Sequence, residues 1–187
     1  GGGDSASQDT AFRAGWTAFF ERAGLGEARK MPRPIRGGGR AQTFDAYCMA
    51  VKTRKPDELP LLLVDSEDLV KAGSDAWKHL KACDHWAKPH GASSADAFLM
   101  ITCMETWFVA DREALKDFFR KGWNDKALPK WPDLEGVEKD KVLEALVKAT
   151  AGKYAKGNFD LLKVINPTVV EKSLPSARAL LERLRKA

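Results

Sequence analysis

Three carboxylates follow a short apolar run, and they are the residues of this chain best suited to chemistry. The run Leu61–Val64 ends in Asp65, and Glu67 and Asp68 come directly after it. Carboxylates packed close together repel one another unless a cation or a proton compensates them. Clustered oxygen ligands of this kind suit Mg²⁺ or Mn²⁺. The cluster therefore predicts a metal site, or alternatively an ordinary acidic loop in which Asp68 caps the next helix.

Two apolar runs predict strands that could position these carboxylates. Leu59–Val64 reads as a strand buried on both faces of a parallel sheet, and Ala97–Cys103 is a second strand that is followed by Glu105. Ligands of open α/β sheets bind beyond the carboxyl ends of the strands. If the strands are parallel neighbours, Asp65 and Glu105 project from the same edge of the sheet. Otherwise Glu105 is simply a favourable acidic residue in the first turn of a helix.

Basic residues beside glycines are candidates for phosphate contacts. Lys153 and Lys156 lie in the segment Gly152–Gly157, where the backbone can approach a ligand closely. Arg40 follows the run Gly37–Gly39 in front of a predicted helix, where free N–H groups and a guanidinium suit an anion. A solvated loop is the simpler interpretation of the lysines, and a run of three glycines is common.

The composition is that of a globular protein with its positive charge at one end. The chain has 187 residues, 44% hydrophobic and 30% charged, and no apolar stretch approaches the ~20 residues of a membrane span. Residues 139–187 carry 11 Lys and Arg against five Asp and Glu, a net charge of +6, whereas residues 1–138 have a net charge of −1. Such a basic region can attract nucleic acid or can be a solvated helix face.

Other common catalytic patterns are missing from the sequence. The three histidines, at positions 79, 85 and 90, do not have the spacing of metal ligands on one helix face, and no GxSxG, Walker A or zinc motif occurs. The three cysteines are widely separated and predict reduced thiols in a cytoplasmic protein.

Alternating strands and helices predict an α/β fold. Thr10–Ala23 has helical spacing, and Met31–Ile35 is a candidate edge strand. Beyond a proline-punctuated linker we expect only helices, at about 138–150, 157–165 and 174–186. We therefore expect an α/β core at 1–128 and a helical C-terminal extension at 129–187, packed together as a single compact unit.

The chain resembles the bacterial domain-of-unknown-function family 4276, which is similar to the Toprim-like superfamily. The matching pieces are Gly1–Ser5, Gly38–Arg40, Leu62–Asp68, Asp84–Trp86, Leu99–Asp111 and Lys153–Gly157. This resemblance implies a Toprim-like central, mostly parallel sheet flanked by helices. It also implies carboxylates that hold Mg²⁺ or Mn²⁺ for breaking or joining phosphodiester bonds, with Asp65 and Glu67 as the acidic pair.

The residue patterns and the resemblance together predict a set of site residues. We expect catalytic roles for Asp65, Glu67, Glu105 and Lys156, phosphate binding by Arg40 and Lys153, and metal binding by Asp65, Glu67 and Asp68. The implied function is Mg²⁺-dependent cleavage of nucleic acid in bacterial defence, beside a separate ATPase partner.

One family feature falls outside the chain. The family's run Glu-Gly-Gly-Gly-Asp-Ser has its glutamate one residue before Gly1, so we expect weak metal binding by the chain as given. This difference favours an alternative function, a non-catalytic interaction module with a vestigial cation site.

Overall fold

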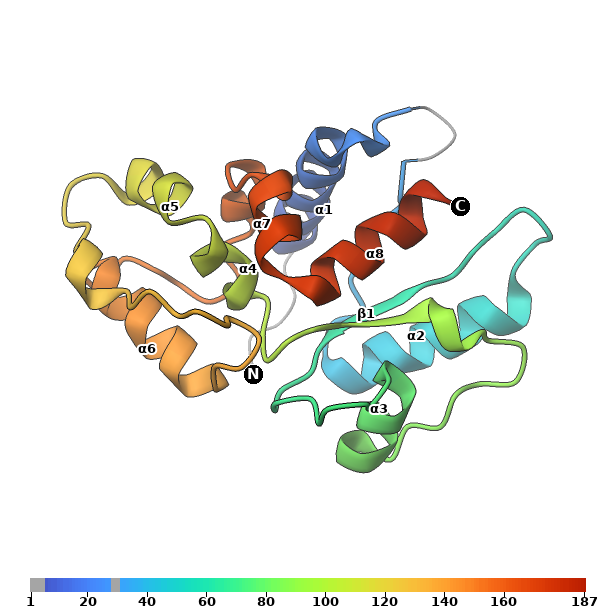
Figure 1. Cartoon of the computed structure of the whole chain (residues 1–187). Helices are drawn as coiled ribbons and strands as arrows, with labels where there is room; N and C mark the ends of the chain where they lie inside the picture. Colours follow the sequence, from blue (N-terminus) through green and yellow to red (C-terminus); the bar gives the residue numbers. More distant parts are fainter. Residues whose placement is uncertain (1–5, 28–30) are drawn as a thin grey trace.

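Helices enclose a small parallel sheet in this α/β fold (Figure 1). The computed structural model describes residues 6–27 and 31–187, so the glycine run Gly1–Ser5 lies outside the described residues. About 54% of the chain is helical.

The sheet has two parallel strands, β1 (Leu62–Asp65) and β2 (Ala97–Met100), with Asp65 opposite Met100. Two further hydrogen bonds extend the pairing beyond the strand ends, from Ser66 N to Met100 O (2.9 Å) and from Glu67 N to Thr102 O (3.0 Å). The parallel pairing predicted from the two apolar runs is therefore present, in a sheet of only two strands within residues 6–27 and 31–187.

Helices cover both faces of the sheet (Figure 1). On one face, Leu62 and Val64 pack with side chains from α2 (Arg40–Thr53) and α3 (Ala76–Asp84). On the other face, α8 (Pro175–Arg185) packs against β2, although the two elements lie far apart in the sequence. Alternate strand residues thus enter two different hydrophobic clusters, as the two-residue period of a strand requires.

The larger cluster joins the N-terminal helix to the C-terminal half of the chain. Helix α1 (Ala6–Phe20) continues into a π-helical turn, Glu21–Leu25, and packs on the 3₁₀ turn Phe159–Lys163. The remaining elements are α4 (Glu105–Ala110), α5 (Arg112–Phe119), α6 (Lys139–Ala149), α7 (Pro167–Ser173) and short 3₁₀ turns at Ser94–Asp96 and Asp125–Ala127. The boundary expected at residues 128/129 stays a prediction.

Close packing of α1 depends on a glycine. A Cβ atom at Gly15 would lie 2.4 Å from the carbonyl oxygen of Phe159. The aromatic side of the same helix packs edge-on against α4, with the rings of Trp16 and Trp107 5.7 Å apart. This contact anchors α4, whose first residue is Glu105, against the main core.

Two local expectations were wrong. The segment Met31–Ile35 is not a strand, consistent with its two prolines, which lack the N–H groups that a sheet ladder needs. Asp68 does not cap the next helix, because α3 begins only at Ala76 and its N-cap is Asp75, which accepts a hydrogen bond from Lys78 N (2.8 Å).

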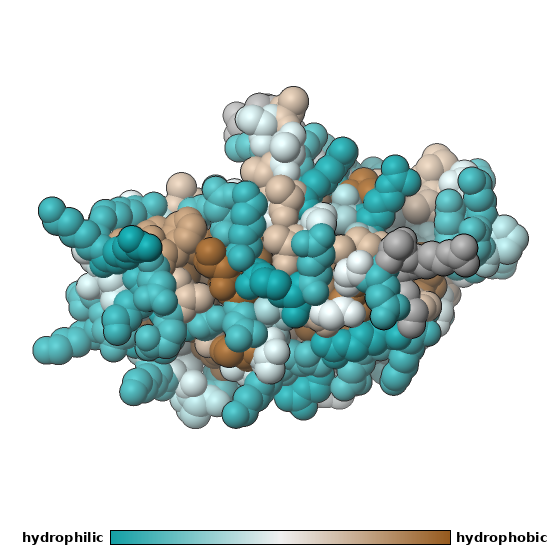
Figure 2. All heavy atoms as spheres, turned by 90° about the horizontal axis from the view of Figure 1, so that it is seen from above, coloured by the Kyte–Doolittle hydropathy of each residue, from teal (hydrophilic) through white to brown (hydrophobic). Residues whose placement is uncertain are grey.

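The visible surface is mostly polar. Hydrophobic side chains show only in small separate areas on the face seen in Figure 2. None of the helices in the described part of the chain is long and apolar enough to cross a membrane.

Candidate active site

Two carboxylates, Asp65 and Glu105, meet at the carboxyl edge of the sheet. Asp65 is the last residue of β1, and Glu105 opens α4 five residues after β2 ends. The side chain of Glu105 is almost completely buried, in a residue that is only 3% exposed. Asp65 Oδ1 is also buried, and no hydrogen-bond partner for it is found within residues 6–27 and 31–187. An unpaired buried carboxyl oxygen is costly, so this atom is the feature of the site that most needs a ligand or a proton.

The electrostatics of Asp65 reflect this crowding. Burial, followed by the charge of Glu105, raises the pKa of Asp65 from 3.8 to about 7, against the opposing effect of Lys139. The same field raises the pKa of the nearby Cys103 thiol to about 11, first through burial and then through Glu105. The carboxyl edge of the sheet therefore disfavours further negative charge and favours a cation.

Tyr154 supplies a hydrogen bond to one of the two carboxylates. Its hydroxyl donates to Glu105 Oε1 at 2.5 Å, and the tyrosine is itself buried. Burial and the neighbouring Glu105 raise the pKa of the phenol, so the hydroxyl keeps its proton and acts as a donor.

Lys139 is the closest basic group on the other side of the site. Its Nζ lies 2.5 Å from Glu67 Oε2. Burial acts to lower the pKa of Lys139, but the charges of Glu67 and Asp65 outweigh it and the pKa is raised. Glu67 adopts a positive φ of 65°, an uncommon conformation for this residue type. Only Ser66 separates this residue from Asp65, so the chain turns sharply just after the end of β1.

Arg40 lies beside the same edge, but its guanidinium already has partners. It donates two hydrogen bonds of 2.7 Å to the carboxylate of Asp84 and another to the backbone oxygen of Asp65. It also lies over the ring of Trp86, 5.0 Å from the ring centre. Trp86 stacks in turn on Phe44, with ring centres 4.4 Å apart. Arg40 thus joins α2 to the end of β1.

The loop after β1 is held by its own polar groups. Ser66 is fully buried, and its hydroxyl donates to the backbone oxygen of Asp68 (2.6 Å). The ring nitrogen Nε2 of His79 bonds to the backbone oxygen of Ser66 (2.9 Å). Asp68 itself is exposed. The structure therefore groups Asp65 with Glu105 and Glu67, and leaves the Asp68 side chain at the surface.

The two lysines predicted to contact a phosphate both lie at the surface. Lys153 is exposed, and its ammonium group donates to the backbone oxygen of Lys121 in the turn after α5. Lys156 is exposed in the next turn. Tyr154, between them, is the residue of this segment that reaches the carboxylates.

Comparison with known proteins gives a family and no function. The model of the family described as "Domain of unknown function (DUF4276)" matches residues 19–185, most of the chain. The chain belongs to this family. No curated protein and no solved structure matches it.

The residues matched to the DUF4276 family include the candidate site at the carboxyl edge of the sheet. The match therefore covers Asp65, Glu105, Lys139 and Tyr154 together. Within the described residues no group of three or more His, Cys, Asp or Glu side chains is arranged to hold a metal ion. A closed protein cage for a metal is therefore not formed by this part of the chain. A pair of carboxylates with an unpaired oxygen does fit a cation that keeps several waters, as Mg²⁺ does.

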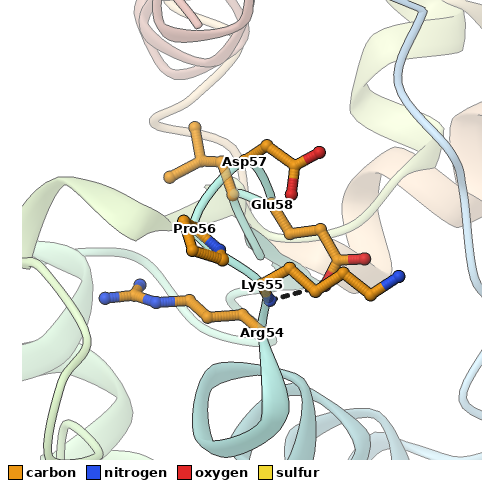
Figure 3. A pocket seen from close by; sticks show the side chains of 6 residues that line it. Arg54, Lys55, Pro56, Asp57 and Glu58 are labelled. Carbon is orange, nitrogen blue, oxygen red and sulfur yellow. Dashed lines mark hydrogen bonds between the residues drawn. The ribbon is translucent and has the colours of Figure 1, made fainter.

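A separate depression elsewhere on this DUF4276 domain is less suited to binding. Six consecutive residues, Arg54–Leu59, line it at the turn after α2 (Figure 3). All six are exposed, and Glu58 accepts a hydrogen bond from the backbone N–H of Lys55 (3.0 Å) within the turn. The acidic edge of the sheet, with its buried polar groups, remains the better candidate site.

Sequence reasoning missed Lys139 and gave Tyr154 no definite role. Both contacts are long-range, because Lys139 lies 72 residues from Glu67 and Tyr154 lies 49 residues from Glu105. The only local signal was that a lysine opens a predicted basic helix, which is also typical of a solvated surface.

Proposed function

We propose that the chain is a Toprim-like, Mg²⁺-dependent phosphodiester-cleaving domain that acts on nucleic acid. The observation that carries this proposal is the pairing of Asp65 with the buried Glu105 at the carboxyl edge of a parallel sheet. Asp65 Oδ1 is buried there without a hydrogen-bond partner among the described residues. A carboxyl with a raised pKa, such as that of Asp65, at this position of an α/β fold is typical of functional sites.

Two carboxylates are sufficient for the metal in this proposal. Mg²⁺ is usually held by one or two carboxylates, with waters and substrate phosphates completing its octahedron. Asp65 and Glu105 would hold the ion, and Glu67 would join them after leaving Lys139. A bound divalent ion supplies Lewis-acid polarisation of a phosphoryl oxygen and lowers the pKa of a bound water.

Lys139 and Arg40 would offset the repulsion between a phosphodiester and the carboxylates at the carboxyl edge of the sheet. Both contribute positive charge beside Asp65, and each is more than half buried in its side chain. Because Lys139 forms an ion pair with the partly exposed Glu67, it can exchange that carboxylate for a phosphate oxygen. This assigns to Lys139 the phosphate contact that the sequence predicted for Lys153 and Lys156.

Cleavage and metal binding test the proposal together. We expect the full chain to bind Mn²⁺ weakly and to cut single- or double-stranded DNA or RNA slowly at low salt. Asp65→Asn should abolish both properties, whereas Asp68→Asn, a matched change in an exposed carboxylate of the same loop, should preserve them. Unchanged Mn²⁺ binding by Asp65→Asn in titration calorimetry would remove Asp65 from the site and refute the proposal.

Lys139 has its own test. Lys139→Met keeps most of the aliphatic side chain and removes the charge, so nucleic-acid binding should weaken and its dependence on log salt should lose a slope of about 1. Lys156→Met, on the exposed turn, is the control and should have the smaller effect.

A non-catalytic interaction module is the second candidate function. The observation that favours it is that the charged neighbours of Asp65 already have protein partners: Lys139 with Glu67, Arg40 with Asp84, and Glu105 with Tyr154. These charged side chains therefore have hydrogen-bond or ion-pair partners without a bound substrate. Mn²⁺ binding without cleavage of DNA or RNA, whether single- or double-stranded, would favour this function.

A further inference from the structure

The buried hydroxyl of Tyr154 is a feature of the acidic edge to which neither the family match nor the proposed chemistry gives a role. We propose that Tyr154 is a positioning residue, whose hydroxyl fixes the carboxylate of Glu105 in the orientation that binds a divalent cation. This inference rests on the proposed function, because it concerns the same pair of carboxylates.

The hydrogen bond leaves one oxygen of Glu105 for a ligand. Tyr154 donates to Oε1 at 2.5 Å, a short hydrogen bond. A carboxylate whose first oxygen is fixed can rotate less, so Oε2 is held in place before a cation arrives. Outer partners of this kind orient metal ligands, and their loss commonly weakens metal binding by ~10–100-fold.

The tyrosine is itself held firmly. Its backbone N–H donates to Thr150 Oγ1 (3.1 Å), and Thr150, which is fully buried, ends α6 with a hydrogen bond from its own N–H to Leu146 O (3.0 Å). Between them the chain reverses through Ala151 and Gly152, both with positive φ. The end of α6 therefore determines where the hydroxyl lies, and through it where Glu105 points.

The other tyrosine of the chain provides a matched control. Tyr47 is also buried, at 5% exposure against 8% for Tyr154, but it belongs to the cluster on the α2–α3 side of the sheet. Its hydroxyl is buried and has no hydrogen-bond partner in the described part of the chain. Tyr47→Phe and Tyr154→Phe thus delete the same atom from two buried rings, and only the second deletion touches a carboxylate of the site.

The experiment measures the affinity of the full chain for Mn²⁺ alone, by titration calorimetry and by electron paramagnetic resonance of the ion. Tyr154→Phe should bind Mn²⁺ ~10–100-fold more weakly than the wild type, and Tyr47→Phe should match the wild type within about twofold. Urea unfolding of each variant measures stability separately, because a purely structural role would lower the unfolding midpoint and leave the affinity of the folded protein unchanged.

The other possible results distinguish failure of the positioning role of Tyr154 from failure of the proposed function. Equal Mn²⁺ affinity in Tyr154→Phe and the wild type overturns the positioning role and leaves the proposed function standing. Equal losses in Tyr154→Phe and Tyr47→Phe also overturn it, because the effect then does not depend on Glu105. If the wild type binds no Mn²⁺, or Asp65→Asn binds it as tightly as the wild type, the proposed function fails and the positioning role fails with it.

Discussion

The raised pKa of Asp65 predicts that this protein loses stability as pH rises. The pKa is about 7 in the folded chain, against 3.8 for an ordinary aspartate. Between these values the folded state holds a proton that the unfolded state has released. The folded state therefore binds more protons, and the free energy of unfolding falls as pH rises through this window.

The size of the loss follows from the same two values. At ~1.4 kcal/mol per pH unit, the full difference corresponds to an upper limit of ~4 kcal/mol between pH 4 and pH 8. We expect about half of this, because the residue is only partly buried and pairs of protein charges behave as in a medium of effective dielectric constant ~20. Asp65→Asn, which cannot ionise, should therefore be more stable than the wild type by about 2 kcal/mol at pH 8 and by much less at pH 4.

Urea unfolding in EDTA at pH 4, 6 and 8 measures this difference. Asp68→Asn serves as control, because Asp68 is exposed and its replacement should leave the pH dependence unchanged. Comparison with the wild type at each pH cancels the titration of the histidines and other shared groups. If the stability gap between Asp65→Asn and the wild type does not widen between pH 4 and pH 8, the inference that Asp65 is crowded by Glu105 is wrong.

Added Mg²⁺ should reverse the loss. A cation that binds only the folded state stabilises it by RT ln(1 + [Mg²⁺]/Kd), which is about 1.4 kcal/mol at ten times Kd. We expect this gain at pH 8 in the wild type and not in Asp65→Asn. A gain of the same size in both proteins would indicate an ion bound elsewhere.

Two further substitutions test how the elements around the site are held. Gly15→Ala should destabilise the chain by about 1–3 kcal/mol in thermal unfolding, because its Cβ would lie 2.4 Å from Phe159 O, whereas helix propensity alone predicts a gain; a stabilised variant would contradict the close packing. Arg40→Lys should lower stability in urea by about 1–3 kcal/mol, because lysine cannot keep both bonds to Asp84 and the contact with Trp86, and an unchanged midpoint would show that these contacts contribute little.

The sequence was sufficient for the elements that depend on local patterns. Two apolar runs predicted β1 and β2, and their parallel pairing follows from the helix that lies between them. Glu105 was expected to open a helix after the second strand, and it does. These features could be predicted because period, run length and the end of a strand are all visible within about ten residues.

Local patterns failed where several residues compete for one role. The end of β1 and the loop after it contain aspartates at 65, 68 and 75, and each is a suitable N-cap by residue type. The structure selects Asp75, which lies directly before the first helical residue. The position of a cap depends on where the helix starts, and the glycine at 73, with φ of 75°, delays that start in a way that the acidic residues do not reveal.

Helix α6 explains why the basic C-terminal region and the acidic edge form one site. It has 11 residues, and at ~1.5 Å per residue it spans about 16 Å. Lys139 lies at its first residue and opposes Glu67, while Tyr154 follows its last turn and binds Glu105. Because Glu67 and Glu105 both act on the charge of Asp65, residues at the two ends of α6 contact the acidic neighbours of one carboxylate. Residues 1–128 contain the three carboxylates of this site but neither of these partners, so the site is complete only when the segment after residue 128 is packed against the sheet.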